Sequence, residues 1–193
     1  MSCWKNVIFT DECQIKMFST RRVIVRRPVS ARFVNRYVTK TVKFGGASVL
    51  VWGAIKADGS KILIKCPDRL NSINYQSVLN EGLFQLYDPE NILMQDGAPC
   101  HKSKSTSDFL ESKNVCVIND WPAQSPDLNI IENMWSILKY RVSKYFTRSK
   151  EKLWDTVCTE WYSIDNDIVK KLYESIPKRL TEIYSSKGQH CKY

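Results

Sequence analysis

Three acidic residues of this sequence have surroundings that suit a metal site. Asp11 and Asp96 each end a short apolar run with the composition of a buried strand, and Glu132 lies near the start of a region with helical periodicity. Open α/β sheets bind ligands beyond the carboxyl ends of their strands, so the two aspartates would converge if their strands were neighbours. Carboxylates that converge away from water repel each other unless a cation lies between them. Mg²⁺ is the expected ion, because it prefers oxygen ligands and is completed by substrate phosphates.

Each of these acids also has an ordinary structural interpretation. Asp11 could simply end a strand, and Asp96 could belong to a turn. Glu132 could close a capping box with Asn129, since the two residues have the N-cap to N3 spacing. Taken singly, the three residues leave both interpretations open. Two further acids lie nearby in the sequence, Asp120 and Asp127.

The apolar pattern predicts the elements that would position these side chains. Strand-like runs cover 7–11 (continued by 14–18), 48–55, 61–65, 91–96 and 115–118. Helical spacing covers 75–86, 103–113, about 126–142, about 150–162 and about 166–185. Three strands with short connections predict an antiparallel start to the sheet, and the later alternation of strands and helices predicts an α/β fold with covered faces.

Positive charge is concentrated in one stretch of the chain. The net charge is +9, yet residues 13–57 carry ten basic residues and no acidic one, with Phe33, Tyr37 and Phe44 interleaved. A solvated surface normally mixes both signs, so this stretch indicates a surface that binds nucleic acid. Its basic residues are Lys16, Arg21, Arg22, Arg26, Arg27, Arg32, Arg36, Lys40, Lys43 and Lys56.

Several classes of protein are disfavoured. No apolar run approaches the roughly 20 residues that a membrane helix needs, and the first residues do not form a secretory signal. The seven cysteines are odd in number and contain no CxxC pair, which argues against a disulfide framework. Two histidines without paired spacing argue against a zinc site. We therefore expect an intracellular protein with reduced thiols.

Five short sequence motifs occur in a distinctive order. They are VIFTDE at 7–12, VKFGG at 42–46, VWG at 51–53, QDGAPCH at 95–101 and WPAQSPDLN at 121–129. Together they resemble the catalytic domain of Tc/mariner superfamily transposases, in the Tc-type branch whose third catalytic acid is Glu. The resemblance extends from about Trp4 to at least Tyr145.

The resemblance implies an RNase H-like (retroviral-integrase-like) fold: a mixed five-stranded sheet with helices on both faces and a C-terminal helical extension. Residues 1–193 would form one catalytic domain, with a core at about 4–145 and further helices at about 146–187. Asp11, Asp96 and Glu132 would be the catalytic triad and would hold two Mg²⁺ or Mn²⁺ ions. The implied partners are transposon ends and target DNA, with a possible homodimer, in the nucleus, with neither a membrane nor a small-molecule cofactor.

Basic residues would then grip the DNA backbone. The expected phosphate contacts are Arg21, Arg22, Arg26, Arg27, Arg32, Arg36 and Lys43, together with Lys139. Ser136 and Lys139 follow Glu132 by one and two helical turns, so they could also meet the strand. Full-length relatives carry an N-terminal pair of helix-turn-helix modules, and so few residues precede the first strand here that we expect no such module.

The sequence departs from the family pattern in three places. Gly97 stands where the family usually has Asn, and Ile130 stands where it usually has Pro. Thirty-five residues separate Asp96 from Glu132, one more than the commonest spacing. Three functions therefore stay open: an active strand-transferase domain, an inactive relic that only binds nucleic acid, and an RNase H-like nuclease with another substrate such as an RNA–DNA hybrid.

The basic stretch makes a prediction about DNA binding. Replacing Arg26 and Arg27 by Gln should weaken binding and flatten its dependence on salt concentration, because fewer counterions would be released from the phosphates. Binding to a labelled duplex at several salt concentrations gives the slope. A slope equal to that of the unaltered chain would contradict the assignment.

Overall fold

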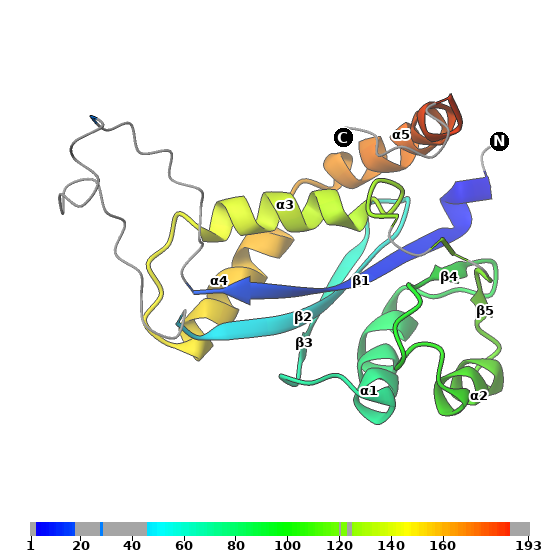
Figure 1. Cartoon of the computed structure of the whole chain (residues 1–193), viewed down its shortest axis with the longest axis horizontal. Helices are drawn as coiled ribbons and strands as arrows, with labels where there is room; N and C mark the ends of the chain where they lie inside the picture. Colours follow the sequence, from blue (N-terminus) through cyan, green and yellow to red (C-terminus); the bar gives the residue numbers. More distant parts are fainter. Residues whose placement is uncertain (1–2, 18–27, 29–45, 120, 123–124, 186–193) are drawn as a thin grey trace.

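The computed structural model describes residues 3–17, 28, 46–119, 121–122 and 125–185. A five-stranded sheet runs through the middle, with helices above and below it (Figure 1). Among these residues, no helix combines the length and apolarity needed to cross a membrane.

The sheet has strand order β3-β2-β1-β4-β5. Its strands are β1 (Val7–Lys16), β2 (Ser48–Ile55), β3 (Lys61–Cys66), β4 (Ile92–Met94) and β5 (Cys116–Val117). The first three strands are antiparallel, and β4 and β5 run parallel to β1. This arrangement confirms the expected mixed sheet, and it meets the condition for convergence, because β1 and β4, which carry or precede Asp11 and Asp96, are neighbours.

The central strand β1 is longer than predicted. It pairs with β2 from Phe9 to Lys16, but with β4 only from Val7 to Phe9. The prediction that Asp11 ends a strand is therefore wrong, because alternating buried and exposed residues continue the strand to Lys16. Asp11 instead lies two residues beyond Phe9, which pairs with the last residue of β4, and Asp96 lies two residues beyond that same end of β4.

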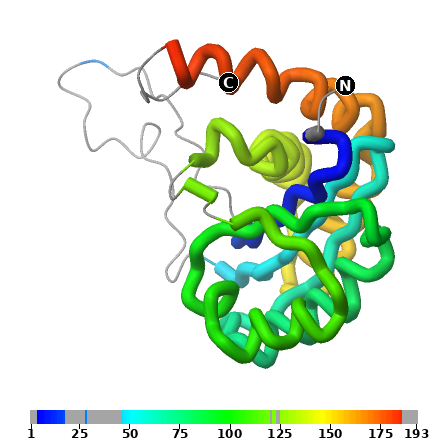
Figure 2. Tube along the Cα trace, turned by 90° about the vertical axis from the view of Figure 1, so that its right-hand side faces the viewer, coloured from blue at the N-terminus to red at the C-terminus, as the bar shows by residue number. Residues whose placement is uncertain are grey.

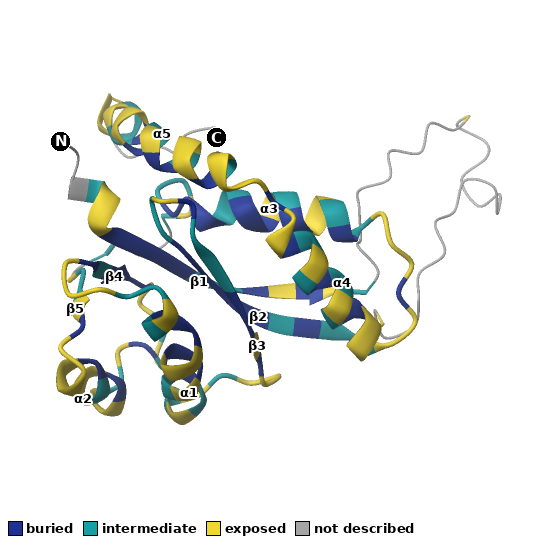
Figure 3. Cartoon of the chain, turned by 180° about the vertical axis from the view of Figure 1, so that it is seen from behind, coloured by how far each residue is buried: buried dark blue, intermediate teal, exposed yellow. Residues whose placement is uncertain are grey.

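Helices cover both faces of the sheet. They are α1 (Ser72–Gly82), α2 (Lys104–Ser112), α3 (Ile131–Val142), α4 (Lys150–Tyr162) and α5 (Asn166–Ser185), with 3₁₀ turns at Cys3–Asn6 and Leu83–Gln85. Figure 2 shows α1 and α2 below the sheet and α3 above it, with α5 across the top. Buried residues line the strands and the inner sides of these helices (Figure 3), so the sheet separates two hydrophobic cores.

Alternation along β1 sends neighbouring side chains into different cores. Phe9, Cys13 and Ile15 belong to the core beneath α3, α4 and α5, whereas Ile8 belongs to the core beside α1 and α2. Side chains of a strand point alternately to its two faces, so Asp11 faces α3 and Glu12 faces α1.

The α3 helix lies close to the sheet because β2 has a glycine at the contact. Trp135 is buried, and an atom added as Cβ at Gly53 would lie 2.5 Å from its ring. Gly53 is also the β2 residue paired with Asp11. The predicted apolar face of this helix is confirmed as buried, from Ile131 to Val142.

A methyl group at Gly53 should push α3 away from the sheet. We expect Gly53→Ala to lower the free energy of unfolding by about 1–3 kcal/mol, as overpacking does. Gly82→Ala is a matched control, because its Cβ would lie 2.6 Å from the Trp52 ring in the other core. Urea unfolding should show a loss in both variants, while the indole N–H signal of Trp135 in NMR spectra should move only in Gly53→Ala. An unmoved Trp135 signal in Gly53→Ala would contradict this account.

Candidate active site

The carboxyl group of Asp11 lies between the sheet and α3. Its Oδ2 accepts a hydrogen bond of 2.9 Å from the indole Nε1 of Trp135. Burial, followed by the negative charges of Glu132 and Glu12, raises the pKa of Asp11 to about 7, although the indole bond lowers it. A carboxyl group held at such a pKa gains from a nearby cation.

Glu132 reaches this carboxyl group from the first turn of α3. The helix begins at Ile131, with Ile130 at the N-cap and no side-chain cap. The alternative interpretation of Glu132 as a capping-box partner of Asn129 is therefore wrong, because Asn129 lies one residue too early. The first turn of a helix favours negative charge through the helix dipole, which offsets part of the repulsion between Glu132 and Asp11.

Asp96 follows β4, and its side chain is 54% exposed. Its Oδ1 accepts a hydrogen bond of 2.9 Å from the backbone N–H of Ala98 and lies 2.7 Å from Nδ1 of His101. The contact with His101, more than the bond to Ala98, lowers the pKa of Asp96. Asp96 lies just before the turn that the bond from His101 to the carbonyl of Ala98 closes, and the bond from Ala98 directs its carboxyl group.

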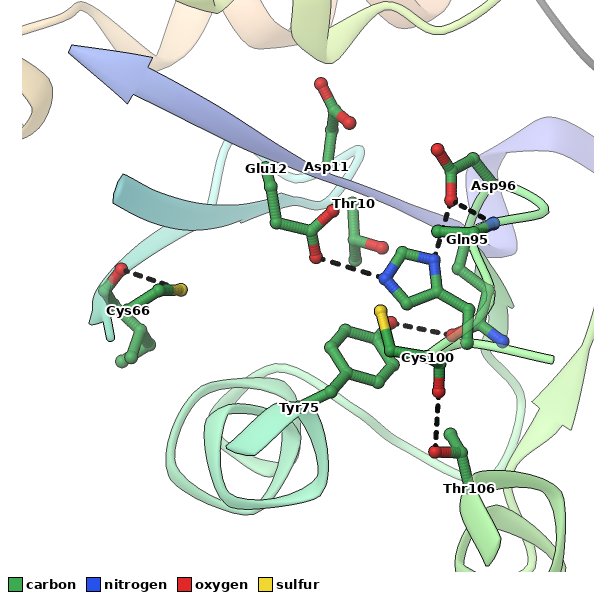
Figure 4. Close-up of polar contacts among 12 residues, drawn as sticks. Thr10, Asp11, Glu12, Cys66, Tyr75, Gln95, Asp96, Cys100 and Thr106 are labelled. Carbon is green, nitrogen blue, oxygen red and sulfur yellow. Dashed lines mark hydrogen bonds and ion pairs between the residues drawn. The ribbon is translucent and has the colours of Figure 1, made fainter. Parts of the chain in front are cut away.

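His101 is a site residue that the sequence reasoning missed. Its ring is buried between two carboxylates, with Nε2 3.3 Å from Oε1 of Glu12 and Nδ1 against Asp96 (Figure 4). Burial lowers the pKa of His101, but these two contacts outweigh it and raise the pKa to about 10. The sequence does contain a signal for this residue, because the motif QDGAPCH places a histidine five residues after a candidate metal ligand.

The structure brings part of the predicted triad together. Asp11 and Glu132 are close enough for their charges to interact, and Figure 4 shows Asp11 and Asp96 on one side of β1, opposite Glu12. Within the described part of the chain, no three His, Cys, Asp or Glu side chains lie close enough to form a metal cluster. The residues nevertheless fit a divalent ion, because Asp11 and Glu132 offer oxygen ligands whose mutual repulsion a cation would remove.

A polar groove of about 940 Å³ opens beside Asp96. Lys102 and Trp121 contribute to its walls, together with Gly97. Gly97 is one of the three departures from the family pattern, and a Cβ placed there would lie 3.3 Å from Nζ of Lys102. The missing side chain therefore leaves room for a lysine amine next to the carboxyl group.

The predicted DNA-contact residues divide into two groups. Lys139 is described: it is exposed on α3, and its charge acts on the thiol of Cys13, two residues after Asp11 on the same face of β1. The other group lies outside the described residues and consists of Arg21, Arg22, Arg26, Arg27, Arg32, Arg36 and Lys43. Asp120 also lies outside the described residues.

Further basic residues follow α3. Lys144 lies 4.6 Å from the centre of the exposed Tyr140 ring, and Arg148 lies 5.9 Å from that of Phe146. Arg141 turns inward instead and donates a hydrogen bond of 2.8 Å to Ser163. The exposed cations and aromatic rings therefore continue past the end of the helix.

Comparison with known proteins identifies relatives over the whole chain. Residues 6–154 match the family model described as DDE superfamily endonuclease. The chain is 31% identical to the transposable element Tcb1 transposase of Caenorhabditis briggsae, and the match covers 98% of this chain and 71% of that protein. It is 29% identical to the transposable element Tc1 transposase of Caenorhabditis elegans, with the same coverage.

Solved structures show the same fold. The chain superposes on a protein of a pre-cleavage Mos1 transpososome with a TM-score of 0.77 at 18% identity, covering 99% of this chain and 58% of that one. It superposes on the catalytic domain of Mos1 mariner transposase with a TM-score of 0.70 at 17% identity, covering 98% and 85%. The chain thus has the RNase H-like fold of these domains and spans little more than half of the transpososome protein.

The environment of Asp11 predicts how stability depends on pH. Its pKa is higher in the folded chain than in the unfolded chain, so its favourable contribution is complete below about pH 4 and is lost as the pH rises through about 7. At pH 7.5, Asp11→Asn should therefore be more stable than the unaltered chain, by up to about 4 kcal/mol, and the difference should vanish near pH 4.

Urea unfolding of both proteins between pH 4 and 7.5 measures this difference. Asp68→Asn is a suitable control, because Asp68 is exposed and paired with Lys150. Equal stability of Asp11→Asn and the unaltered chain at pH 7.5 would show that Asp11 is not held in an unfavourable environment.

Proposed function

The chain belongs to the DDE superfamily of endonucleases and is homologous to Tc1-type transposases, and we propose that it cleaves DNA strands and transfers their ends. The reaction would use divalent metal ions. The observation that carries the proposal is the pair formed by Asp11 and Glu132. Burial and like charge raise the pKa of Asp11 at the point where β1 and the start of α3 meet. Such strongly shifted groups mark functional sites more often than structural ones.

Asp11, Asp96 and Glu132 are the proposed metal ligands, with Mg²⁺ or Mn²⁺ as the ions. These three carboxylates would hold the ions between them. Solved structures of the relative Mos1 are described as complexes with Mn and with Mg, which supports this choice. When bound, two such ions activate a water or a DNA 3′-hydroxyl for attack on phosphorus and stabilise the leaving oxygen.

The protein groups orient these ligands. Trp135 fixes one oxygen of Asp11 through its indole N–H, and the start of α3 fixes the backbone of Glu132. The turn after β4 fixes one oxygen of Asp96. Because these contacts use backbone and buried rings rather than mobile surface groups, the carboxylates need little reorganisation when the reaction begins.

DNA is the proposed partner. Lys102 lies beside Gly97, next to Asp96, and Lys139 lies near Cys13; both would contact phosphates next to the reacting bond. The rings of Tyr140 and Phe146, each accompanied by a cation, suit contacts with bases or sugars. Residues 21–43 would add phosphate contacts.

The finer assignments rest on the relatives. Transposon ends and target DNA are the proposed substrates, because the relatives are named as transposases of transposable elements and solved Mos1 structures are described as paired-end and strand transfer complexes. We further propose that residues 1–193 work as one catalytic domain, in a homodimer that pairs two DNA ends, in the nucleus.

Nicking of supercoiled plasmid tests the proposed activity. With Mg²⁺ or Mn²⁺, the unaltered chain should convert plasmid to open circles, and Asp11→Asn, Asp96→Asn and Glu132→Gln should each slow this conversion roughly 100-fold or more, because loss of a metal ligand removes several kcal/mol of transition-state stabilisation. Asp167→Asn, at an exposed acid on α5, is the matched control and should cleave normally.

Two outcomes would reject a catalytic role. Cleavage at equal rates by the unaltered chain and Asp96→Asn would point to a contaminating nuclease. No cleavage by either, with DNA binding retained, would identify a chain that only binds nucleic acid. Cleavage of an RNA–DNA hybrid in preference to duplex DNA would instead favour a nuclease with another substrate.

A further inference from the structure

A buried histidine ring joins two parts of the sheet that are far apart in sequence. Only 3% of the His101 side chain is exposed. Its Nε2 lies 3.3 Å from Oε1 of Glu12 on β1, and its Nδ1 lies 2.7 Å from Oδ1 of Asp96 after β4. Nε2 is within hydrogen-bond geometry of Glu12, whereas Nδ1 meets Asp96 at ion-pair distance without hydrogen-bond geometry, so each ring nitrogen faces a carboxylate oxygen.

The surroundings of this ring prevent it from turning. Tyr75 of α1 packs on it, with ring centres 4.1 Å apart and planes 33° from parallel. The Tyr75 hydroxyl points away from the imidazole contacts and donates to Oε1 of Gln95 at 2.7 Å. The backbone N–H of His101 also donates to the carbonyl of Ala98.

This arrangement decides which oxygen of Asp96 is left for other partners. Oδ1 accepts a hydrogen bond from the N–H of Ala98 and forms an ion pair with Nδ1 of His101 at 2.7 Å. The carboxyl group is more than half exposed, and a side chain in that position would otherwise sample several rotamers. With Oδ1 held from below, Oδ2 remains on the side of β1 where Asp11 lies (Figure 4).

We propose that His101 is a positioning residue, which holds Asp96 in the rotamer that presents Oδ2 to the metal site, and that Glu12 orients the imidazole ring for this purpose. The inference rests on the proposed metal site and adds to it a buried partner for one of its ligands. Hydrogen bonds from behind a metal ligand fix its direction and commonly change metal affinity 10–100-fold when they are lost.

A simpler role would be that of a tie between β1 and the turn after β4. The two roles use different ring nitrogens: the tie depends on Nε2 and Glu12, whereas positioning depends on Nδ1 and Asp96. Asn can place an amide donor near the position of Nδ1, and Gln can place one near the position of Nε2. The variants His101→Asn and His101→Gln therefore separate the two roles within one side chain.

Two measurements on the full chain test the proposal, with His101→Ala as the variant that removes both donors. The first is the set of side-chain rotamers of Asp96, from three-bond NMR couplings in metal-free protein. The second is the dissociation constant for Mn²⁺, by calorimetry. We expect one Asp96 rotamer in the unaltered chain and in His101→Asn, and averaged rotamers with Mn²⁺ binding about tenfold weaker in His101→Gln and His101→Ala.

Tyr75→Phe is the control for packing, because it keeps the aromatic ring on His101 and removes the bond to Gln95. It should leave Mn²⁺ binding within twofold. Equal losses in His101→Asn and His101→Gln, or better rescue by Gln, would overturn the positioning role in favour of a tie. Unchanged rotamers and unchanged Mn²⁺ binding in His101→Ala would overturn it as well.

The metal proposal can fail separately. If the unaltered chain binds no Mn²⁺, or if Asp11→Asn and Asp96→Asn bind it equally well, the metal site is rejected. The Asp96 rotamers in metal-free protein still decide whether His101 sets the direction of that carboxyl group.

Discussion

The hydrogen bond from the indole of Trp135 to Asp11 is the contact on which the arrangement of the site depends. It requires the ring to lie directly over Gly53, and this close approach sets the distance between α3 and the sheet. The first turn of α3, and Glu132 with it, is thereby brought next to Asp11. An element that contributes much of the hydrophobic core thus also carries the third carboxylate, so packing and site geometry cannot be altered independently.

The two cores serve the site from opposite directions. Above the sheet, a buried indole contacts Asp11, and below it a buried imidazole contacts both Glu12 and Asp96. Charged groups at such depth are tolerated because each has a hydrogen-bonding or ionic partner. The carboxylates that are proposed to meet metal and DNA therefore lie between the two cores, next to the end of β4.

Much of this could be predicted from sequence because it depends on local patterns. Alternation and helical spacing gave the strands, the helices and the buried face that includes Trp135. The remainder depends on contacts between distant segments. Nothing near Trp135 in sequence shows that it faces Asp11, since this follows from the pairing of Gly53 with that residue. His101 was missed for the same reason: its two partners lie on different elements, and only the fold brings them together.

The corrections also have physical causes. Asn129 has the right chemistry for a helix cap, but the helix begins after Ile130 and leaves Asn129 in the preceding turn. The end of β1 was placed too early because Asp11 and Glu12 interrupt an apolar run. Both acids are accommodated within the strand, one on each face, since the neighbouring positions keep the alternation up to Lys16.

That alternation makes the site sensitive to insertions and deletions in β1. One residue added between Phe9 and Asp11 would turn Asp11 towards the imidazole and place its predecessor under the indole, because a shift of one exchanges the two faces of a strand. The same residues would still be present in the sequence, but their side chains would point to the opposite faces of the sheet. The register of side chains along β1 is therefore more strictly constrained than the composition of the strand. Insertions and deletions among relatives should accumulate in loops, such as the connection between α2 and α3, rather than in β1.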